Sequence, residues 1–219
     1  MSRKRRGREN PYRRPDHHTR AAKAAGFAAR SVFKLEEIDR RARLLKPGQH
    51  VLDLGAAPGS WSAYAASRIG RPGVLVAIDL KPMQQALGGN AHIIEGDAYD
   101  EVHVESGLIG EHAPYDVVLS DMAPNTTGHR ATDQIRSFDV FMRALSLAKR
   151  LGKPGSSFVG KIFMSGHFPD AREAVRLAYE DVKVLKPEAV RDVSYEIFLV
   201  GMGLREHMQP KPDEETSCG

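Results

Sequence analysis

The chain has 219 residues and a net charge of +4, and with 41% hydrophobic and 27% charged residues it has the balance of one globular domain. No apolar run approaches the roughly 18 residues of a membrane span, and the N-terminus lacks the apolar segment of a secretion signal. The single cysteine, Cys218, excludes a disulfide framework and a cysteine-based zinc site, and the nine histidines show no ligand spacing on an evident helix, so we expect a cytoplasmic protein without a metal.

The N-terminal segment is the most basic part of the chain. Residues 1–20 contain eight Arg and Lys against two acids, a local charge of +6, so the remainder of the chain carries −2. We expect residues 1–18 to be a disordered tail, because they contain little to bury. Such a tail usually binds the phosphates of nucleic acid in a salt-dependent way. The alternative is a solvated tail that only improves solubility.

Beyond the tail, the apolar pattern predicts alternating helices and strands. Apolar residues at helical spacing between residues 27 and 45 predict an amphipathic helix that carries Lys34, and KPGQ at 46–49 ends it. Short apolar runs predict seven strands, at residues 50–54, 74–79, 91–96, 115–121, 156–163, 182–185 and 195–202. Further helices are expected at residues 60–69, 100–110, 132–151 and 168–180.

This alternation predicts an α/β fold with a doubly wound, seven-stranded and mostly parallel sheet. Several runs are apolar on successive residues, which indicates strands covered on both faces. We expect a single domain over residues 19–204, followed by a loose polar tail at 205–219.

Polar residues gather at the predicted strand ends, beyond which ligands of such sheets bind. Four of the five strand ends that carry polar groups hold an acid, and the fifth holds Lys161. The acids are Asp53, Asp79, Asp97 and Asp121. A purely structural sheet does not need this arrangement.

The first strand passes into a loop of small residues, from Gly55 to Gly59, and then into a helix. Small residues let a ligand approach main-chain N–H groups at a helix N-terminus. The loop is not G-x-G-x-x-G, and Pro58 supplies no N–H, which weakens the case for a nicotinamide oxidoreductase that must bind a diphosphate.

The acids of the next two strand ends suit a nucleoside. Asp79 can accept both hydroxyls of a ribose, and Asp97 can accept the exocyclic amine of adenine. S-adenosylmethionine (SAM) is therefore the predicted cofactor. Plainer roles stay open, since Asp53 can cap loop amides, Asp97 can be a turn residue, and Trp61 can belong to the core or the pocket wall.

Four polar residues have catalytic character: Lys34, Asp121, Lys161 and Glu196. Lys161 and Glu196 stand within the apolar runs FVGKIF and SYEIFLV, where a charge is costly unless it is paired or functional. One interpretation is two ion pairs, Lys161 with Asp121 and Lys34 with Glu196, that only neutralise each other.

These segments carry a resemblance. RSVFKLEEID, VLDLGAAPGSWS, SDMAPNTTG, FVGKIF and SYEIFLVG are similar, in this order from about Ala28 to Gly203, to the FtsJ/RrmJ (RlmE) family of ribosomal RNA 2′-O-methyltransferases. The resemblance implies a Rossmann-like class I SAM-dependent methyltransferase. Ser60 is a departure, because bacterial members often have a second glycine there.

The resemblance also implies site residues. The family's catalytic Lys-Asp-Lys-Glu set falls on Lys34, Asp121, Lys161 and Glu196. Its cofactor contacts fall on Gly59, Trp61, Asp79, Asp97 and Asp121, to which the loop adds Asp53 and Gly55. The implied substrate is a uridine ribose in large-subunit (23S) ribosomal RNA or its particle, and we expect a monomer.

In the implied reaction a ribose 2′-oxygen attacks the sulfonium methyl in line. Lys161 accepts the hydroxyl proton and Asp121 orients it; alternatively, Lys161 stays charged and steers the hydroxyl while water takes the proton. Lys34 and Glu196 position the ribose, and the tail with Tyr12 and Arg30 contacts RNA.

Three rival functions remain. The chain can be a non-catalytic RNA-binding ribosome-assembly factor, or it can methylate another RNA. Methylation of a base amine is disfavoured, since SDMAPN lacks the aromatic residue that stacks a base in such enzymes.

Overall fold

The computed structural model describes residues 31–188 and 195–206, with the side chains of Glu105 and Ser106 excepted. The basic tail, with Tyr12 and Arg30, lies outside the described residues, as does nearly all of the predicted C-terminal tail. The expected roles of these segments therefore stay predictions.

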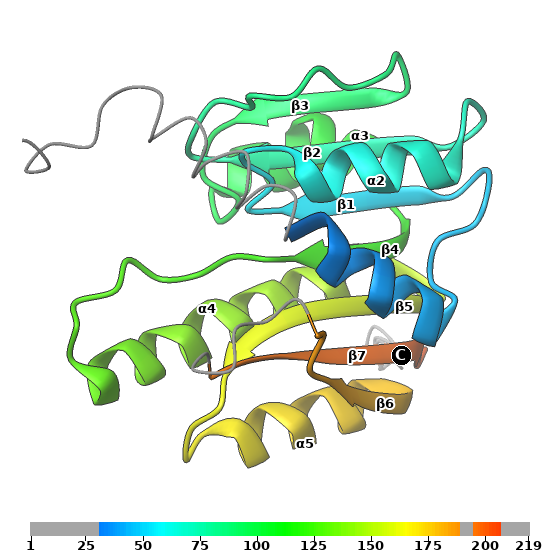
Figure 1. Cartoon of the computed structure of the whole chain (residues 1–219). Coiled ribbons are helices and arrows are strands. Elements are labelled where there is room, and N and C mark those ends of the chain that lie inside the picture. The colour runs from blue at the N-terminus through cyan, green and yellow to red at the C-terminus, as the bar shows by residue number, and fades with distance from the viewer. Residues whose placement is uncertain (1–30, 189–194, 207–219) are drawn as a thin grey trace, which may run out of the picture.

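A seven-stranded sheet forms the centre of the molecule, in the order β3-β2-β1-β4-β5-β7-β6 (Figure 1). The strands are β1 (His50–Leu54), β2 (Val74–Asp79), β3 (Ala91–Glu95), β4 (Tyr115–Ser120), β5 (Gly152–Phe163), β6 (Tyr179–Leu185) and β7 (Glu196–Leu204). Strands β1 to β5 pair in parallel, whereas β7 is antiparallel to both β5 and β6. The predicted mostly parallel sheet is confirmed.

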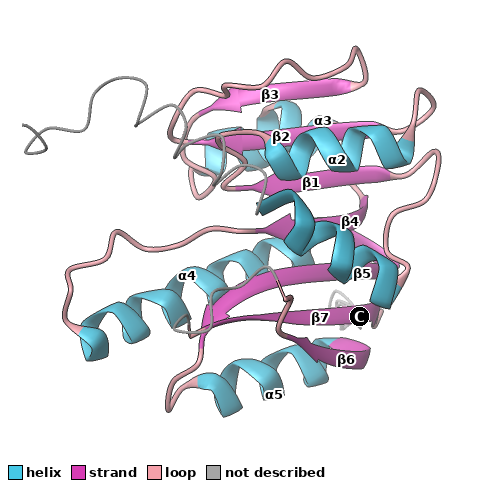
Figure 2. Cartoon of the chain, viewed as in Figure 1, coloured by secondary structure: helices cyan, strands magenta, loops and turns pink. Residues whose placement is uncertain are grey.

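Helices cover both faces of the sheet (Figure 2). Residues 31–42 are helical and, with α2 (Ser60–Ile69), pack on one face through a cluster that includes Leu35, Trp61 and Phe198. On the other face lie α3 (Leu108–Glu111), α4 (Arg130–Leu151) and α5 (Phe168–Ala178), packed around Phe141, Phe158 and Tyr179. The central strands β1, β2 and β4 are almost wholly buried, because helices cover them from both sides.

The helical stretch expected over residues 100–110 is present, but it is divided into two. A π-helical turn (Val102–Ser106) and the short α3 make it up, and Gly107 between them has an extended backbone. A Cβ at Gly107 would lie 2.9 Å from the carbonyl oxygen of His103, so this close approach suits glycine.

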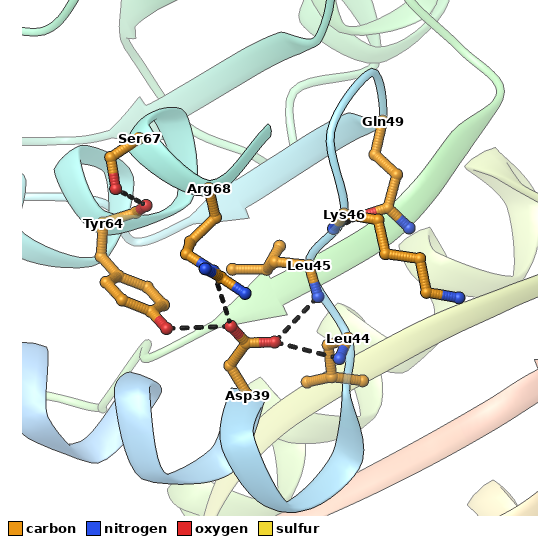
Figure 3. A network of polar contacts seen from close by, with 8 residues as sticks. All are labelled: Asp39, Leu44, Leu45, Lys46, Gln49, Tyr64, Ser67 and Arg68. Carbon is orange, nitrogen blue, oxygen red and sulfur yellow. Dashed lines mark hydrogen bonds and ion pairs between the residues drawn. The ribbon is translucent and has the colours of Figure 1, made fainter. Parts of the chain in front are cut away.

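A network around Asp39 fastens the helix over residues 31–42 to α2 (Figure 3). One carboxylate oxygen accepts from the amides of Leu44 and Leu45, at 3.0 and 2.9 Å. The other accepts from the Tyr64 hydroxyl at 2.9 Å and from Arg68 Nε at 3.3 Å. Burial and the hydrogen bond to Asp39 raise the pKa of Tyr64 to about 12. This network fixes the helix that carries Lys34.

The order in which the chain adds strands to the sheet reverses between the parallel neighbours β1 and β4. From β1 the chain proceeds to β2 and β3 on one side, and from β4 to β5 on the other. A crevice at such a switch point, beyond the carboxyl ends of the strands, is the usual ligand site of doubly wound sheets. In this chain the loop after β1 and the segment that begins at Asp121 flank the switch point.

Candidate functional site

The loop after β1 is tightly packed around two glycines with left-handed backbone. Gly55 has φ 74°, and a Cβ there would lie 2.4 Å from Met122 Cγ, while Gly59 has φ 112°. The loop amides are used within the protein: those of Gly55 and Ala56 donate to the Ile78 carbonyl, and that of Ala57 donates to Asp79. The N–H groups that remain for a ligand are therefore those of the first turn of α2, which have no intrahelical acceptor.

Asp79 and Asp97 both hold local turns. Asp79 accepts from the amides of Ala57 and Lys81, at 2.9 and 2.8 Å. Asp97 is exposed and accepts from the Tyr99 amide at 2.9 Å, so its turn role is present. Their predicted contacts with a ribose and an adenine stay predictions.

Asp53 is the most unusual acid of the site. It is fully buried, and one carboxylate oxygen accepts from the Ser62 hydroxyl at 2.6 Å, while its Oδ1 has no hydrogen-bond partner among the described residues. Burial, together with the nearby charges of Asp121 and Asp79, raises the pKa of Asp53 from 3.8 to about 7. The bond is to Ser62 rather than to a loop amide, so capping of the loop does not explain this residue.

Trp61 is part of the wall that joins the two helices of its face. Its side chain is buried, and its Nε1 donates to the Ser31 carbonyl oxygen at 2.8 Å. Its ring lies 5.7 Å from that of Phe198, centroid to centroid. Trp61 therefore belongs to the core, which was one of the roles that the sequence left open for it.

Lys161 and Asp121 form the first of the two ion pairs that the sequence suggested. Lys161 Nζ lies 2.8 Å from Asp121 Oδ1, and it donates to the Asp121 carbonyl oxygen at 2.6 Å. The side chain of Lys161 is only 8% exposed, so its ammonium depends on these oxygens in place of water. Ser31 donates to the second oxygen of Asp121 at 3.2 Å.

Lys34 and Glu196 form the second pair, with 2.8 Å between Lys34 Nζ and Glu196 Oε2. Phe198 connects the two pairs, because it lies opposite Lys161 in the β5–β7 ladder and its ring centroid is 5.9 Å from Lys34 Nζ. All four predicted catalytic residues therefore meet at the carboxyl edge of β4 and β5. Amines and carboxylates so placed can orient a hydroxyl group and accept its proton.

Three contributors were not predicted: Ser31, Ser62 and Phe198. Ser31 precedes Lys34 by three residues, which places both on one helix face. Ser62 directly follows Trp61, and Phe198 follows Glu196 by two residues on the same side of β7. Helical and strand spacing from the predicted residues could have indicated Ser31 and Phe198.

Two absences concern the described residues alone. Within residues 31–188 and 195–206, no group of three or more His, Cys, Asp or Glu is arranged to hold a metal ion. No helix in this part of the chain is both long and apolar enough to span a membrane.

Residues 27–204 match the sequence model of the FtsJ-like methyltransferases. The chain belongs to this family. It is 58% identical to "Ribosomal RNA large subunit methyltransferase E" of Sorangium cellulosum, over 89% of this chain and 90% of that protein. It is 46% identical to the protein of the same name from Bdellovibrio bacteriovorus, over 87% of this chain and 97% of that one.

Solved structures show the same fold. A protein of Plasmodium falciparum described as a ribosomal RNA methyltransferase superposes with a TM-score of 0.69 at 22% identity, over 80% of this chain and 97% of that one. Fibrillarin of Aeropyrum pernix, solved with S-adenosyl-L-methionine, superposes with a TM-score of 0.52 at 14% identity, over 72% of this FtsJ-like chain and 67% of fibrillarin. The fold is that of the Rossmann-like class I methyltransferases, as predicted.

Proposed function

We propose that the protein transfers a methyl group from SAM to the 2′-hydroxyl of a uridine in large-subunit ribosomal RNA. One observation supports this most strongly: Lys34, Asp121, Lys161 and Glu196 converge beside the glycine loop. The names of the curated relatives support a large-subunit RNA as substrate. The resemblance of the motifs supports the ribose of a uridine as the acceptor.

The residues around the crevice fit SAM. Among the residues that the structure describes, none is a hydrogen-bond partner for the buried Asp53 Oδ1, and an ammonium group such as that at the amino-acid end of SAM would provide one. Asp79 and Asp97 stand at successive strand ends, where they can bind the ribose and the adenine, while Gly59 and Trp61 shape the turn into α2. When bound, SAM supplies an electrophilic methyl group.

The chain's own residues align and deprotonate the acceptor. Once its ammonium has released a proton to solvent, Lys161 takes the proton of the 2′-hydroxyl as a neutral amine, and Asp121 orients that amine through the contact at 2.8 Å. Lys34 and Glu196 position the ribose on the neighbouring side. Because the sulfonium loses its charge as the methyl leaves, alignment contributes more than stabilisation of a new charge.

A non-catalytic assembly factor would not need this arrangement. Two ion pairs that are largely buried contribute little to stability, because the cost of removing the charges from water opposes their attraction. The presence of both pairs at this end of the sheet therefore favours an enzyme.

The function is tested by transfer of labelled methyl groups to large-subunit particles and to free ribosomal RNA, followed by mapping of the labelled nucleotide. Lys161→Ala should lower transfer by about 10²- to 10⁴-fold, the usual contribution of an acid–base group, with SAM affinity nearly unchanged. Lys153→Ala is the matched control, since Lys153 is also ion-paired on β5, with Asp116, but at the opposite edge of the sheet.

Comparable turnover of Lys161→Ala and wild type would remove Lys161 from its assigned role. Label on a base nitrogen or carbon, rather than on a ribose, would refute the proposed acceptor. Label in another RNA would leave the chemistry intact and reject the substrate.

A further inference from the structure

A cavity of about 350 Å³ opens beside Glu196, and none of the predicted cofactor contacts lines it. It lies where β5 ends and α4 begins, and its walls include Arg130, Gln134, Phe163 and Tyr195. None of these four residues was singled out by the sequence, and the roles proposed above do not use them. Their position relative to the catalytic groups suggests what they do.

The cavity begins close to the catalytic lysine. Phe163 follows Lys161 by two residues on β5, so both side chains lie on one side of the sheet, about 7 Å apart along the strand. Glu196 lies opposite Phe163 in the ladder and bonds Lys34. A ribose held between these groups has its base within one sugar of them, because the base and the 2′-hydroxyl are attached to neighbouring ring carbons.

The walls have the chemistry that binds a base. The Arg130 guanidinium lies over the Tyr195 ring, 4.1 Å from its centroid, so the two groups form a cation–π pair. Tyr195 is 52% exposed, which leaves ring surface for a ligand. Proteins that bind unpaired nucleotides stack the bases on aromatic rings and on arginine planes of this kind.

The walls are also tied to one another. Asp133 accepts from the amides of Thr127 and Gly128, at 2.7 and 3.2 Å, which fixes the loop that leads into α4. Gln134 donates from Nε2 to the Met164 carbonyl oxygen at 3.1 Å, which links α4 to the end of β5. Binding therefore requires little ordering of the cavity, which favours affinity.

We propose that this cavity receives the base of the nucleotide whose ribose is methylated, with the base stacked on the Arg130–Tyr195 pair. The inference rests on the proposed function and adds a residue-level subsite to it. Stacking accepts any flat base, so the cavity holds the base and thereby fixes the ribose at Lys161.

Steady-state methyl transfer to large-subunit particles from cells without the enzyme tests this subsite with the full-length chain. Tyr195→Ala and Arg130→Ala should each lower kcat/KM for the particle by about tenfold, the equivalent of about 1.4 kcal/mol and within the range for one base–aromatic stack. SAM affinity, measured by calorimetry, should stay at the wild-type value, which also shows that the variants fold.

Two further variants separate stacking from charge. Tyr195→Phe keeps the ring and should recover most of the loss caused by alanine. Arg172→Ala removes an exposed arginine of α5 that does not line the cavity, and it should leave kcat/KM unchanged.

The outcomes distinguish the inference from the proposed function. If wild type methylates a ribose and Tyr195→Ala does so equally well, the subsite is refuted while the function stands. If Arg172→Ala causes the same loss as Arg130→Ala, the effect is general attraction of RNA, and the subsite is again refuted. If wild type does not methylate ribose at all, the function fails first and the subsite fails with it.

Discussion

Replacing Asp53 with asparagine should change how the stability of the protein depends on pH. The carboxyl group is fully buried, and its pKa is raised from 3.8 to about 7, chiefly by burial. At about 1.4 kcal/mol per pKa unit, the ionised group costs the folded state about 4 kcal/mol at high pH. Asparagine keeps an acceptor for the Ser62 hydroxyl and carries no charge.

The sign follows from proton binding. The pKa of Asp53 is higher in the folded state than in the unfolded state, so the folded state binds more protons between pH 3.8 and about pH 7. The contribution of Asp53 to stability therefore falls as pH rises through this window. About 2–3 kcal/mol of the loss lies between pH 5 and pH 8, where other carboxyl groups change little.

The assay is urea unfolding of wild type and Asp53→Asn at pH 5 and at pH 8, with linear extrapolation to water. The free energy of unfolding of the variant should rise by about 2–3 kcal/mol relative to that of wild type between pH 5 and pH 8. Asp139→Asn, an exposed position of α4, controls for the substitution itself. An equal difference between wild type and Asp53→Asn at both pH values would refute the reasoning. The affinity for SAM should fall in Asp53→Asn, because a buried carboxylate that destabilises the fold is expected to serve the function instead.

Three more predictions concern the frame and the tail. Asp39→Ala should lower the free energy of unfolding in urea by about 3–5 kcal/mol, because it leaves the buried amides of Leu44 and Leu45 without an acceptor and breaks the network of Figure 3. A loss below about 1 kcal/mol would contradict that role. Gly55→Ala should lower the free energy of unfolding by at least about 1 kcal/mol more than Gly48→Ala, because both glycines have positive φ but only Gly55 is crowded by Met122. Equal shifts of the two variants in a thermal melt would argue against the clash with Met122. Deletion of residues 1–18 should weaken RNA binding and flatten its dependence on salt in a filter-binding titration, and an unchanged salt slope would mean that the tail only improves solubility.

The parts of the fold that local pattern controls were predictable. Buried strands need apolar residues in succession, and helices need them at a spacing of three and four, so seven strands and most helices could be located. The helical stretch predicted at residues 100–110 is interrupted at Gly107, which takes an extended conformation that periodicity does not register. The N–H groups at the helix N-terminus were expected to face a ligand, and they remain available, but three amides of the loop before it bond to β2 residues, which only the neighbouring strand could reveal.

The candidate site could also be predicted only in part from the sequence. Lysine and glutamate within apolar runs are costly in any fold, so Lys161 and Glu196 could be recognised as paired or functional from the sequence by itself. The order of the motifs likewise sufficed to indicate a methyltransferase family and its strand-end acids.

Only the tertiary structure decided how these residues meet. Lys34 and Glu196 are 162 positions apart, and their contact depends on β7 entering the sheet between β5 and β6 in the antiparallel direction. The same insertion sets Glu196 opposite Phe163 and opens the cavity beside it. Only the structure shows that Asp53 is buried and that its Oδ1 has no hydrogen-bond partner among the described residues. The physical reason is that periodicity and composition report on each segment's exposure to water, whereas strand order and register, which set long-range contacts, result from the packing of all segments together.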